Sequence, residues 1–276
     1  MMHDTGRPVI NYTRGGSGEP LLLINGWTAS GSVWPADWIR QLEERFLVIR
    51  PDNRGSGWSR TAARPFSIAD LADDAKTVME ACGVERARVL GLSMGGMIAQ
   101  ELTLRHPDAV ERLVLVGTRP PTPAAVLSAP HLLVDSMRRP GRDESLWEYF
   151  RVMWAAFAGP DFAKSHAERL DELVEQIVRR PTPRQGMFDQ VRAMMAWRGA
   201  QRLTGIAVPT DVIHGDSDPL IPVANGRRLA ALIPGAQYQE LVGVGHLVPQ
   251  EAGEFLLETL AREPARPISV LRPRGR

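Results

Sequence analysis

The sequence of 276 residues contains a single cysteine, Cys82, so no disulfide can form within the chain. It also lacks the closely spaced cysteine and histidine pairs that bind zinc. We therefore expect a protein with neither a disulfide nor a metal ion.

An excess of charge of one sign is also missing. The 33 basic residues balance the 32 acidic ones and leave a formal net charge of +1. Because a nucleic-acid-binding surface needs a basic excess, this balance argues against a nucleic-acid partner.

Long hydrophobic runs are absent as well. No stretch approaches the ~18 consecutive apolar residues of a transmembrane helix. Residues 1–7 lack the apolar centre of a signal peptide. We expect a cytoplasmic protein that does not bind a membrane.

What the chain does have is a regular alternation of two apolar patterns, within a composition that is 43% hydrophobic. Short apolar runs predict strands at residues 9–12, 21–24, 46–49, 89–92, 113–116, 208–213 and 238–241. Apolar residues at helical spacing predict helices at residues 33–45, 68–79, 94–105, 222–233 and 250–261. Ser67 is the expected N-cap of the second helix, with Asp70 three residues further on. Alternating strands and helices indicate an α/β fold, in which helices cover both faces of a mostly parallel sheet.

This alternation stops after residue 118. Prolines cluster there, and the sequence up to residue 200 carries helical patterns at residues 143–157 and 162–178 and after Pro183, but no strand pattern. We interpret residues 119–200 as an all-helical cap inserted into a core made of residues 1–118 and 201–263. Residues 264–276 are rich in proline and arginine, and we expect this basic tail to be disordered.

The residues between strand 89–92 and helix 94–105 carry the first chemical signal. They read Gly91-Leu-Ser93-Met-Gly95, which fits the pattern G-x-S-x-G. A sharp turn from strand to helix strains the serine backbone, and side chains on the flanking glycines would clash. Such a turn exposes the serine hydroxyl above the sheet, where amides that open the helix can bind an oxyanion.

Two further residues complete a catalytic triad in the order serine, acid, histidine. Asp218 follows strand 208–213, and His246 follows strand 238–241. Loops after parallel strands converge at the carboxyl edge of the sheet, so both side chains are expected beside Ser93. Asp216 competes with Asp218 for the role of the acid, although it stands nearer the strand. We interpret His214 as structural.

With these motifs in view, the chain resembles the α/β-hydrolase superfamily over nearly its whole length. The resemblance rests on Asn25-Gly26-Trp27, Asp52-Asn-Arg54-Gly55, Gly91-Leu-Ser93-Met-Gly95-Gly96, His214-Gly215-Asp-Ser-Asp218 and Gly245-His246. Within it, the serine motif and the helical insertion look like those of capped esterases, enol-lactonases and cofactor-free haloperoxidases.

The resemblance implies that Ser93 is the nucleophile, His246 the general base and Asp218 the residue that orients it. It implies that the backbone amides of Trp27 and Met94 bind the oxyanion, and that no cofactor takes part. One departure is Asn25-Gly26, where the superfamily usually has His-Gly. We expect Asp52 and Arg54 to brace the neighbouring loops as an ion pair.

The sequence indicates the substrate less directly than it indicates the catalytic residues. Apolar side chains are expected to line the site, and the candidates are Trp27, Phe150, Met153, Trp154 and Met194. We expect a small to medium apolar ester or lactone, cleaved through an acyl-enzyme. A haloperoxidase or perhydrolase, a hydrolase of C–C bonds and a small-molecule receptor remain as alternatives.

Overall fold

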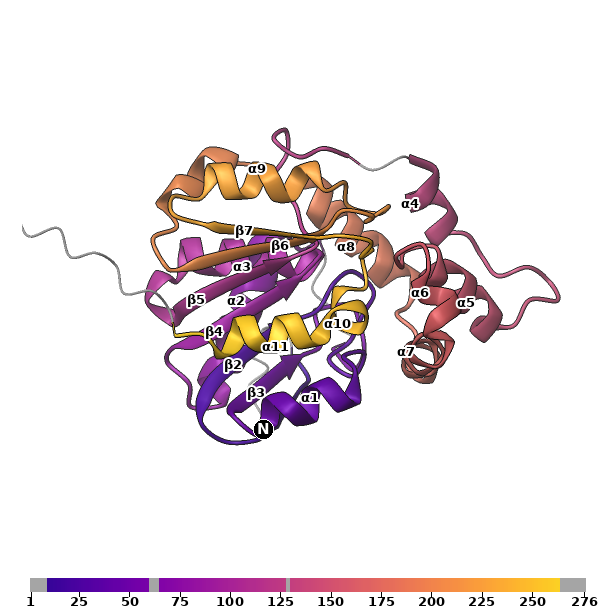
Figure 1. Ribbon diagram of the computed structural model, residues 1–276, viewed down its shortest axis with the longest axis horizontal. Coiled ribbons are helices and arrows are strands. Elements are labelled where there is room, and N and C mark those ends of the chain that lie inside the picture. Colours follow the sequence, from indigo (N-terminus) through magenta and orange to yellow (C-terminus); the bar gives the residue numbers. More distant parts are fainter. Residues whose placement is uncertain (1–8, 60–64, 128–129, 264–276) are drawn as a thin grey trace, which may run out of the picture.

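The computed structural model describes residues 9–59, 65–127 and 130–263 of the chain (Figure 1). The predicted disorder of residues 264–276 lies outside this part. The sheet has the strand order β1-β3-β2-β4-β5-β6-β7. Its strands are β1 (Tyr12–Gly15), β2 (Glu19–Ile24), β3 (Phe46–Pro51), β4 (Ala87–Leu92), β5 (Val110–Val116), β6 (Thr210–Gly215) and β7 (Gln237–Leu241).

All neighbouring strands run parallel except β1, which is antiparallel to β3. The predicted mostly parallel sheet is therefore confirmed. The prediction of a strand at residues 9–12 was wrong by three residues. Tyr12 pairs with Pro51, the last residue of β3, so residues 9–11 extend past the end of the strand that would pair with them.

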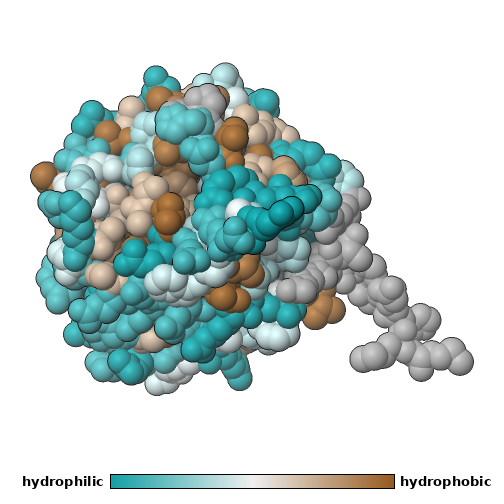
Figure 2. All heavy atoms as spheres, turned by 90° about the vertical axis from the view of Figure 1, so that its right-hand side faces the viewer, coloured by the Kyte–Doolittle hydropathy of each residue, from teal (hydrophilic) through white to brown (hydrophobic). Residues whose placement is uncertain are grey.

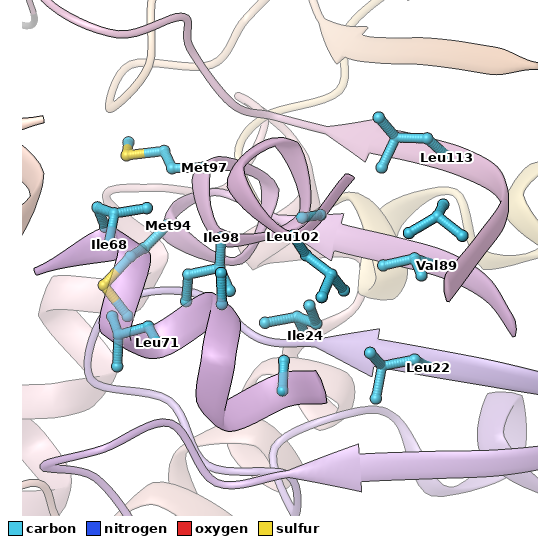
Figure 3. Packing of buried hydrophobic residues seen from close by; sticks show 14 of the residues in the cluster. Leu22, Ile24, Ile68, Leu71, Val89, Met94, Met97, Ile98, Leu102 and Leu113 are labelled. Atoms are coloured by element: carbon cyan, nitrogen blue, oxygen red, sulfur yellow. The ribbon is translucent and has the colours of Figure 1, made fainter. Parts of the chain in front are cut away.

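Both faces of the sheet are covered, because successive residues of each strand point to opposite sides. In β2, Leu22 and Ile24 pack in one cluster with residues of α2 (Ile68–Ala81) and α3 (Met94–Arg105) (Figure 3). Leu21 and Leu23 pack in another, with residues of α1 (Ala36–Glu43) and α11 (Gly253–Ala261). The continuous apolar runs of the sequence thus correspond to strands buried on both faces.

The remaining core helices agree with the sequence patterns in place and differ in detail. Ser67 and Asp70 form the predicted capping box at the start of α2. The predicted helix at residues 250–261 is divided into α10 (Val248–Glu251) and α11, because Ala252 adopts a non-helical φ of −140°. The other elements are α9 (Ala224–Leu232) and two 3-10 turns, Pro107–Ala109 and Ala200–Gly205.

Five helices, here called the cap helices, separate β5 from β6. They are α4 (Pro130–Ser136), α5 (Leu146–Ala155), α6 (Phe162–Ser165), α7 (Ala167–Arg179) and α8 (Arg184–Ala196). Helices α4–α7 lie at one end of the sheet (Figure 1). The sequence pattern missed α4 and joined α6 to α7, which are separated at His166.

The cap helices share an apolar cluster with Ala29, Val33 and Leu247 of the core loops. Its members include Tyr149, Phe150, Met153, Phe157, Leu170, Leu173, Val174 and Ile177. On the outer face of this end, hydrophilic side chains are interspersed with hydrophobic ones (Figure 2). Among the described helices, none has the length and hydrophobicity needed to cross a bilayer.

Candidate active site

Ser93 stands at the turn between β4 and α3 with a φ of +56°, a conformation that is rare outside glycine. Its backbone N–H donates to the carbonyl of Val116 on the neighbouring strand, at 2.9 Å. A Cβ at Gly95 would overlap the carbonyl oxygen of Ile24, and one at Gly91 would overlap that of Gly95. The glycines of the motif are therefore needed for the steric reason that the sequence suggested.

Thr118, two residues after the end of β5, stabilises the same turn. The hydroxyl of Thr118 donates to the carbonyl oxygen of Ser93 at 2.6 Å. Thr118 also fills the space that a Cβ at Gly96 would need. Thr118 is thus a supporting residue that the sequence analysis did not single out.

His246 and Asp218 meet at the same edge of the sheet. Nδ1 of His246 lies 2.7 Å from Oδ2 of Asp218, and both side chains are buried. The other oxygen, Oδ1, accepts the backbone N–H groups of Leu220 and Ile221 at 2.9 and 2.8 Å. Three hydrogen bonds therefore fix the carboxylate, and the carboxylate in turn orients the imidazole.

The electrostatic surroundings keep Asp218 ionised. Burial alone would raise the pKa of this carboxyl, but the charge of His246 and hydrogen bonds from His214 and His246 outweigh it and lower the pKa to about 2. The contact from His214 is long, with Nε2 3.5 Å from Oδ2, whereas the same nitrogen lies 2.8 Å from the carbonyl oxygen of Ile221. His214 is fully buried and supports the loop, in keeping with a structural role.

Asp216, the competing acid, points elsewhere. It is exposed, and its Oδ1 accepts hydrogen bonds from the Ser217 hydroxyl and the Gly243 backbone, both at 2.8 Å. Asp218 is therefore the carboxylate that contacts His246.

The loop after β2 lies against Ser93. A Cβ at Gly26 would come within 3.6 Å of Oγ of Ser93. In place of the usual histidine, Asn25 accepts the N–H of Gly26 at 2.7 Å and donates to the carbonyl of Ser30 at 3.1 Å. Asn25 therefore stabilises the loop through hydrogen bonds to the backbone of the loop itself.

Helix α8 and the residues before it hold the same loop from the other side. The indole N–H of Trp27 donates to the carbonyl of Met187 at 3.1 Å. Thr28, which has a φ of +65°, donates its N–H to Oε1 of Gln190 at 3.0 Å and accepts from the hydroxyl of Thr182 at 2.7 Å. Because a positive φ costs free energy in a threonine, these bonds stabilise a strained conformation. No sequence pattern singles out Gln190, which reads only as a polar residue within a helix.

The expected ion pair between Asp52 and Arg54 was wrong, although both residues do brace loops. Arg54 instead forms a bidentate pair with Asp74 of α2, at 2.9 and 2.7 Å. Asp52 accepts the backbone N–H groups of Gly31 and Trp58 at 2.7 and 2.8 Å.

A second carboxylate, Glu251, joins the histidine loop to the cap helices. Its Oε2 accepts the N–H groups of Gly159 and Gly245, both at 2.9 Å, and its Oε1 accepts that of Leu247 at 3.1 Å. Burial raises the pKa of Glu251, although these backbone bonds and His246 oppose the rise. The sequence analysis missed Glu251; its signal is a carboxylate just after the apolar residues that follow His246.

Ser93 and His246 both line a cavity of about 30 Å³ between the sheet edge and the cap helices. Trp27, Met153 and Trp154 line it, as do Trp34, Leu173 and Gln250. Phe150 and Met194 are not part of this lining. Phe150 contacts Tyr149 edge to face inside the cap cluster, and Met194 packs against the cluster under α3, so helical spacing alone did not separate packing positions from cavity-lining ones.

The described residues contain no group of three or more His, Cys, Asp or Glu side chains that could hold a metal ion. The site instead combines a strained serine between strand and helix with a buried histidine–carboxylate pair. This arrangement at the carboxyl edge of a parallel sheet defines the class of α/β hydrolases.

Comparisons with known proteins place the chain in the same class. Residues 19–252 match the family model of the alpha/beta hydrolase fold, and the chain belongs to this family. It is 31% identical over 235 residues to the RutD protein of Caulobacter segnis, a candidate carbamate hydrolase, with 83% of this chain and 84% of the relative covered.

Two solved structures are also similar. The enol-lactonase from Burkholderia xenovorans LB400 is 27% identical, with a TM-score of 0.76 and coverage of 91% of this chain and 94% of its own. Est816, described as an N-acyl homoserine lactone degrading enzyme, is 27% identical, with a TM-score of 0.72 and coverage of 91% and 95%.

Proposed function

We propose that this α/β hydrolase cleaves a short carboxylic ester or lactone through an acyl-enzyme formed on Ser93. The observation that carries the proposal is the buried 2.7 Å contact between His246 and Asp218, on the wall of the cavity that Ser93 also lines. A serine hydroxyl is a weak nucleophile until an adjacent base accepts its proton, and this pair supplies an oriented base.

The reaction has two steps. Oγ of Ser93 attacks the carbonyl carbon while His246 accepts its proton, and His246 then passes that proton to the leaving oxygen as the ester bond breaks. In the second step His246 accepts a proton from water, which attacks the acyl-enzyme. The acid leaves, and Ser93 regains its proton.

The negative charge of each tetrahedral intermediate falls on the former carbonyl oxygen. We assign its stabilisation to the backbone amides of Trp27 and Met94. Met94 is the first residue of α3, so its N–H has no partner within the helix. Trp27 follows Gly26, which lies against Ser93. Each such donor contributes about 3 kcal/mol to stabilisation of the transition state.

The substrate class follows from the walls and size of the cavity. Most lining residues are apolar, and a volume of about 30 Å³ leaves little room beside Ser93, so a short acyl group fits best. The names of the enol-lactonase and of Est816 support adding lactones, and that of the RutD relative supports adding carbamates to the compounds tested. Residues 119–200 act in this proposal as the cap that closes the cavity.

The test is steady-state hydrolysis of p-nitrophenyl acetate, butyrate, hexanoate and octanoate, together with a γ-lactone, an enol-lactone and a methyl carbamate. We expect multiple turnovers, with kcat/KM highest for acyl chains of about two to four carbons. A receptor would release at most about one equivalent of product. Absence of turnover on every compound would refute the proposal.

A further inference from the structure

A groove of about 800 Å³ lies next to the active-site cavity, between helices α1 and α7 (Figure 1). An ion pair joins its two walls, in which Arg169 of α7 donates to Asp37 of α1 at 2.9 Å. Most residues that line the groove are polar or charged, whereas most residues that line the cavity are apolar. The chain therefore has a small apolar hollow beside Ser93 and a much larger polar one next to it.

Four residues line both hollows, and they are here called the partition: Val33, Trp34, Leu173 and Gln250. Val33, Trp34 and Leu173 are 6%, 3% and 4% exposed, so they are packed within the partition and do not line an open channel. Because the same residue borders the cavity and the groove, the partition is one residue thick at these positions. Truncation of such a side chain would join the two hollows.

The acyl chain is the part of the substrate that the cavity must hold. In the acyl-enzyme of the proposed reaction, this chain is bonded to Ser93 after the alcohol has left. Ser93 and His246 both line the cavity, whose volume is about 30 Å³. A short chain fills this space, and a longer one meets the partition, which cannot yield freely because protein interiors are closely packed.

Leu173 is the partition residue that comes from the cap helices, where it lies on α7. The other three belong to the core. Val33 and Trp34 lie in the loop before α1, and Gln250 lies on α10, close in sequence to His246. Leu173 can therefore be truncated without changing an element that carries a proposed catalytic residue.

We propose that Leu173 sets the length of the acyl chain that the enzyme accepts, because its side chain separates the cavity from the groove. This inference rests on the proposed ester hydrolysis and deepens it by naming a residue that determines acyl specificity. In Leu173→Ala the cavity should open into the groove, so that a longer chain passes through the partition. A single methylene in a hydrophobic pocket changes kcat/KM by about 10- to 200-fold, so removal of this barrier should have a large effect.

The experiment measures kcat/KM for p-nitrophenyl butyrate and octanoate. We expect the ratio of octanoate to butyrate to rise by at least about tenfold in Leu173→Ala. Leu170→Ala is the matched control, since Leu170 is fully buried on the same helix and in the same apolar cluster but lines neither hollow. It loses the same atoms from the cap and should leave the ratio unchanged.

Val33→Ala tests the partition from the core side and removes fewer atoms. It should raise the same ratio, by less than Leu173→Ala does. Val174→Ala is its control, because Val174 is fully buried in the same cluster and lines neither hollow. Urea unfolding identifies the variants that fold, and if Leu173→Ala does not, the pair Val33→Ala and Val174→Ala decides.

Alkylboronic acids separate the acyl chain from the leaving alcohol. They bond to Oγ of a catalytic serine and place their alkyl chain where the acyl chain lies, so propylboronic and heptylboronic acid correspond to the butyryl and octanoyl groups. We expect Leu173→Ala to strengthen inhibition by the heptyl compound relative to the propyl compound by at least about tenfold. Butyl and octyl acetate vary the alcohol instead, and their ratio should not change.

The outcomes separate this inference from the proposed function. Equal hydrolysis of butyrate and octanoate by the wild type, or equal ratios in folded Leu173→Ala and Leu170→Ala, would overturn the role of Leu173 and leave ester hydrolysis intact. A change confined to the two acetates would also overturn it, because Leu173 would then contact the leaving alcohol. No hydrolysis of any ester would refute both.

Discussion

The backbone N–H of His246 donates to the carbonyl oxygen of Phe157 at 2.8 Å. Phe157 belongs to the apolar cluster of the cap helices and also lines the cavity. The loop that carries His246 packs closely against the backbone that follows Phe157, because a Cβ at Gly245 would overlap the backbone of Ala158 and Gly159. The position of the proposed base therefore depends on the cap helices as well as on the sheet.

Glu251 is expected to maintain this arrangement. It accepts N–H groups from Gly159 on the cap side and from Gly245 and Leu247 on the histidine side. In Glu251→Gln one oxygen becomes an NH₂ group that cannot accept, so at least one buried N–H loses its partner. We expect a loss of stability of about 1–3 kcal/mol. We also expect kcat to fall about tenfold, with a smaller change in KM, because the base is misplaced rather than the substrate.

Urea unfolding and steady-state kinetics measure these two effects. Glu254→Gln, an exposed position in the first turn of α11, is the matched control and should change neither. Unaltered kcat in Glu251→Gln would mean that this carboxylate has no part in positioning His246.

Ser93→Ala tests the nucleophile. Because the acyl-enzyme cannot form without the hydroxyl, we expect kcat to fall by about 10⁴-fold or more. A fluorophosphonate probe should label the wild type at one equivalent, on Ser93, and leave the variant unlabelled in intact-mass measurements. The exposed Ser165→Ala is the control for a lost hydroxyl. Turnover of the Ser93→Ala protein at the wild-type rate would end the assignment.

Gln190→Leu tests the loop that carries the amide of Trp27. The variant removes the acceptor of the Thr28 N–H, so the strained residue beside the proposed oxyanion donor can relax. Loss of one oxyanion donor lowers kcat by about 10²–10³-fold, and a displaced donor should cost part of this, roughly 10- to 100-fold. KM should change less. Gln201→Leu, an exposed position in the 3-10 turn Ala200–Gly205 that follows this helix, should behave as the wild type. Equal kcat in the two variants would show that Gln190 does not support the oxyanion site.

Local patterns carried the successful predictions from sequence. The capping box of Ser67 and Asp70, the glycines around Ser93 and the alternation of apolar runs depend on residues close together in the chain. The meeting of Asp218 and His246 was also predicted, since parallel strands bring successive loops to one edge.

The contacts that escaped prediction join elements that no local pattern relates. Arg54 pairs with Asp74 rather than with its near neighbour Asp52, because the packing of α2 brings Asp74 to it. The places of Phe150 and Met194 depended on how the cap helices pack on the core, and amphipathic spacing marks only which face is buried. Gln190 and Glu251 bond to backbone groups far along the chain or across a turn, so the residues next to them in sequence do not indicate these partners.

The low pKa of Asp218 predicts how stability depends on pH. The folded-state pKa of about 2 lies below the ordinary value of 3.8, so the folded protein binds this proton less readily than the unfolded chain. The stabilisation from ionised Asp218 is therefore fully present above about pH 5 and is lost as the pH falls from there toward 2.

In Asp218→Asn this contribution is absent at every pH. The difference in free energy of unfolding between wild type and variant should shrink as the pH falls from 5 to 3. Urea titrations at each pH measure it, with the exposed Asp216→Asn as the control, whose difference from wild type should stay within about 0.5 kcal/mol throughout. A difference for Asp218→Asn that grows as the pH falls would require the opposite sign of the pKa shift, and the carboxylate would then not be the charged partner of His246.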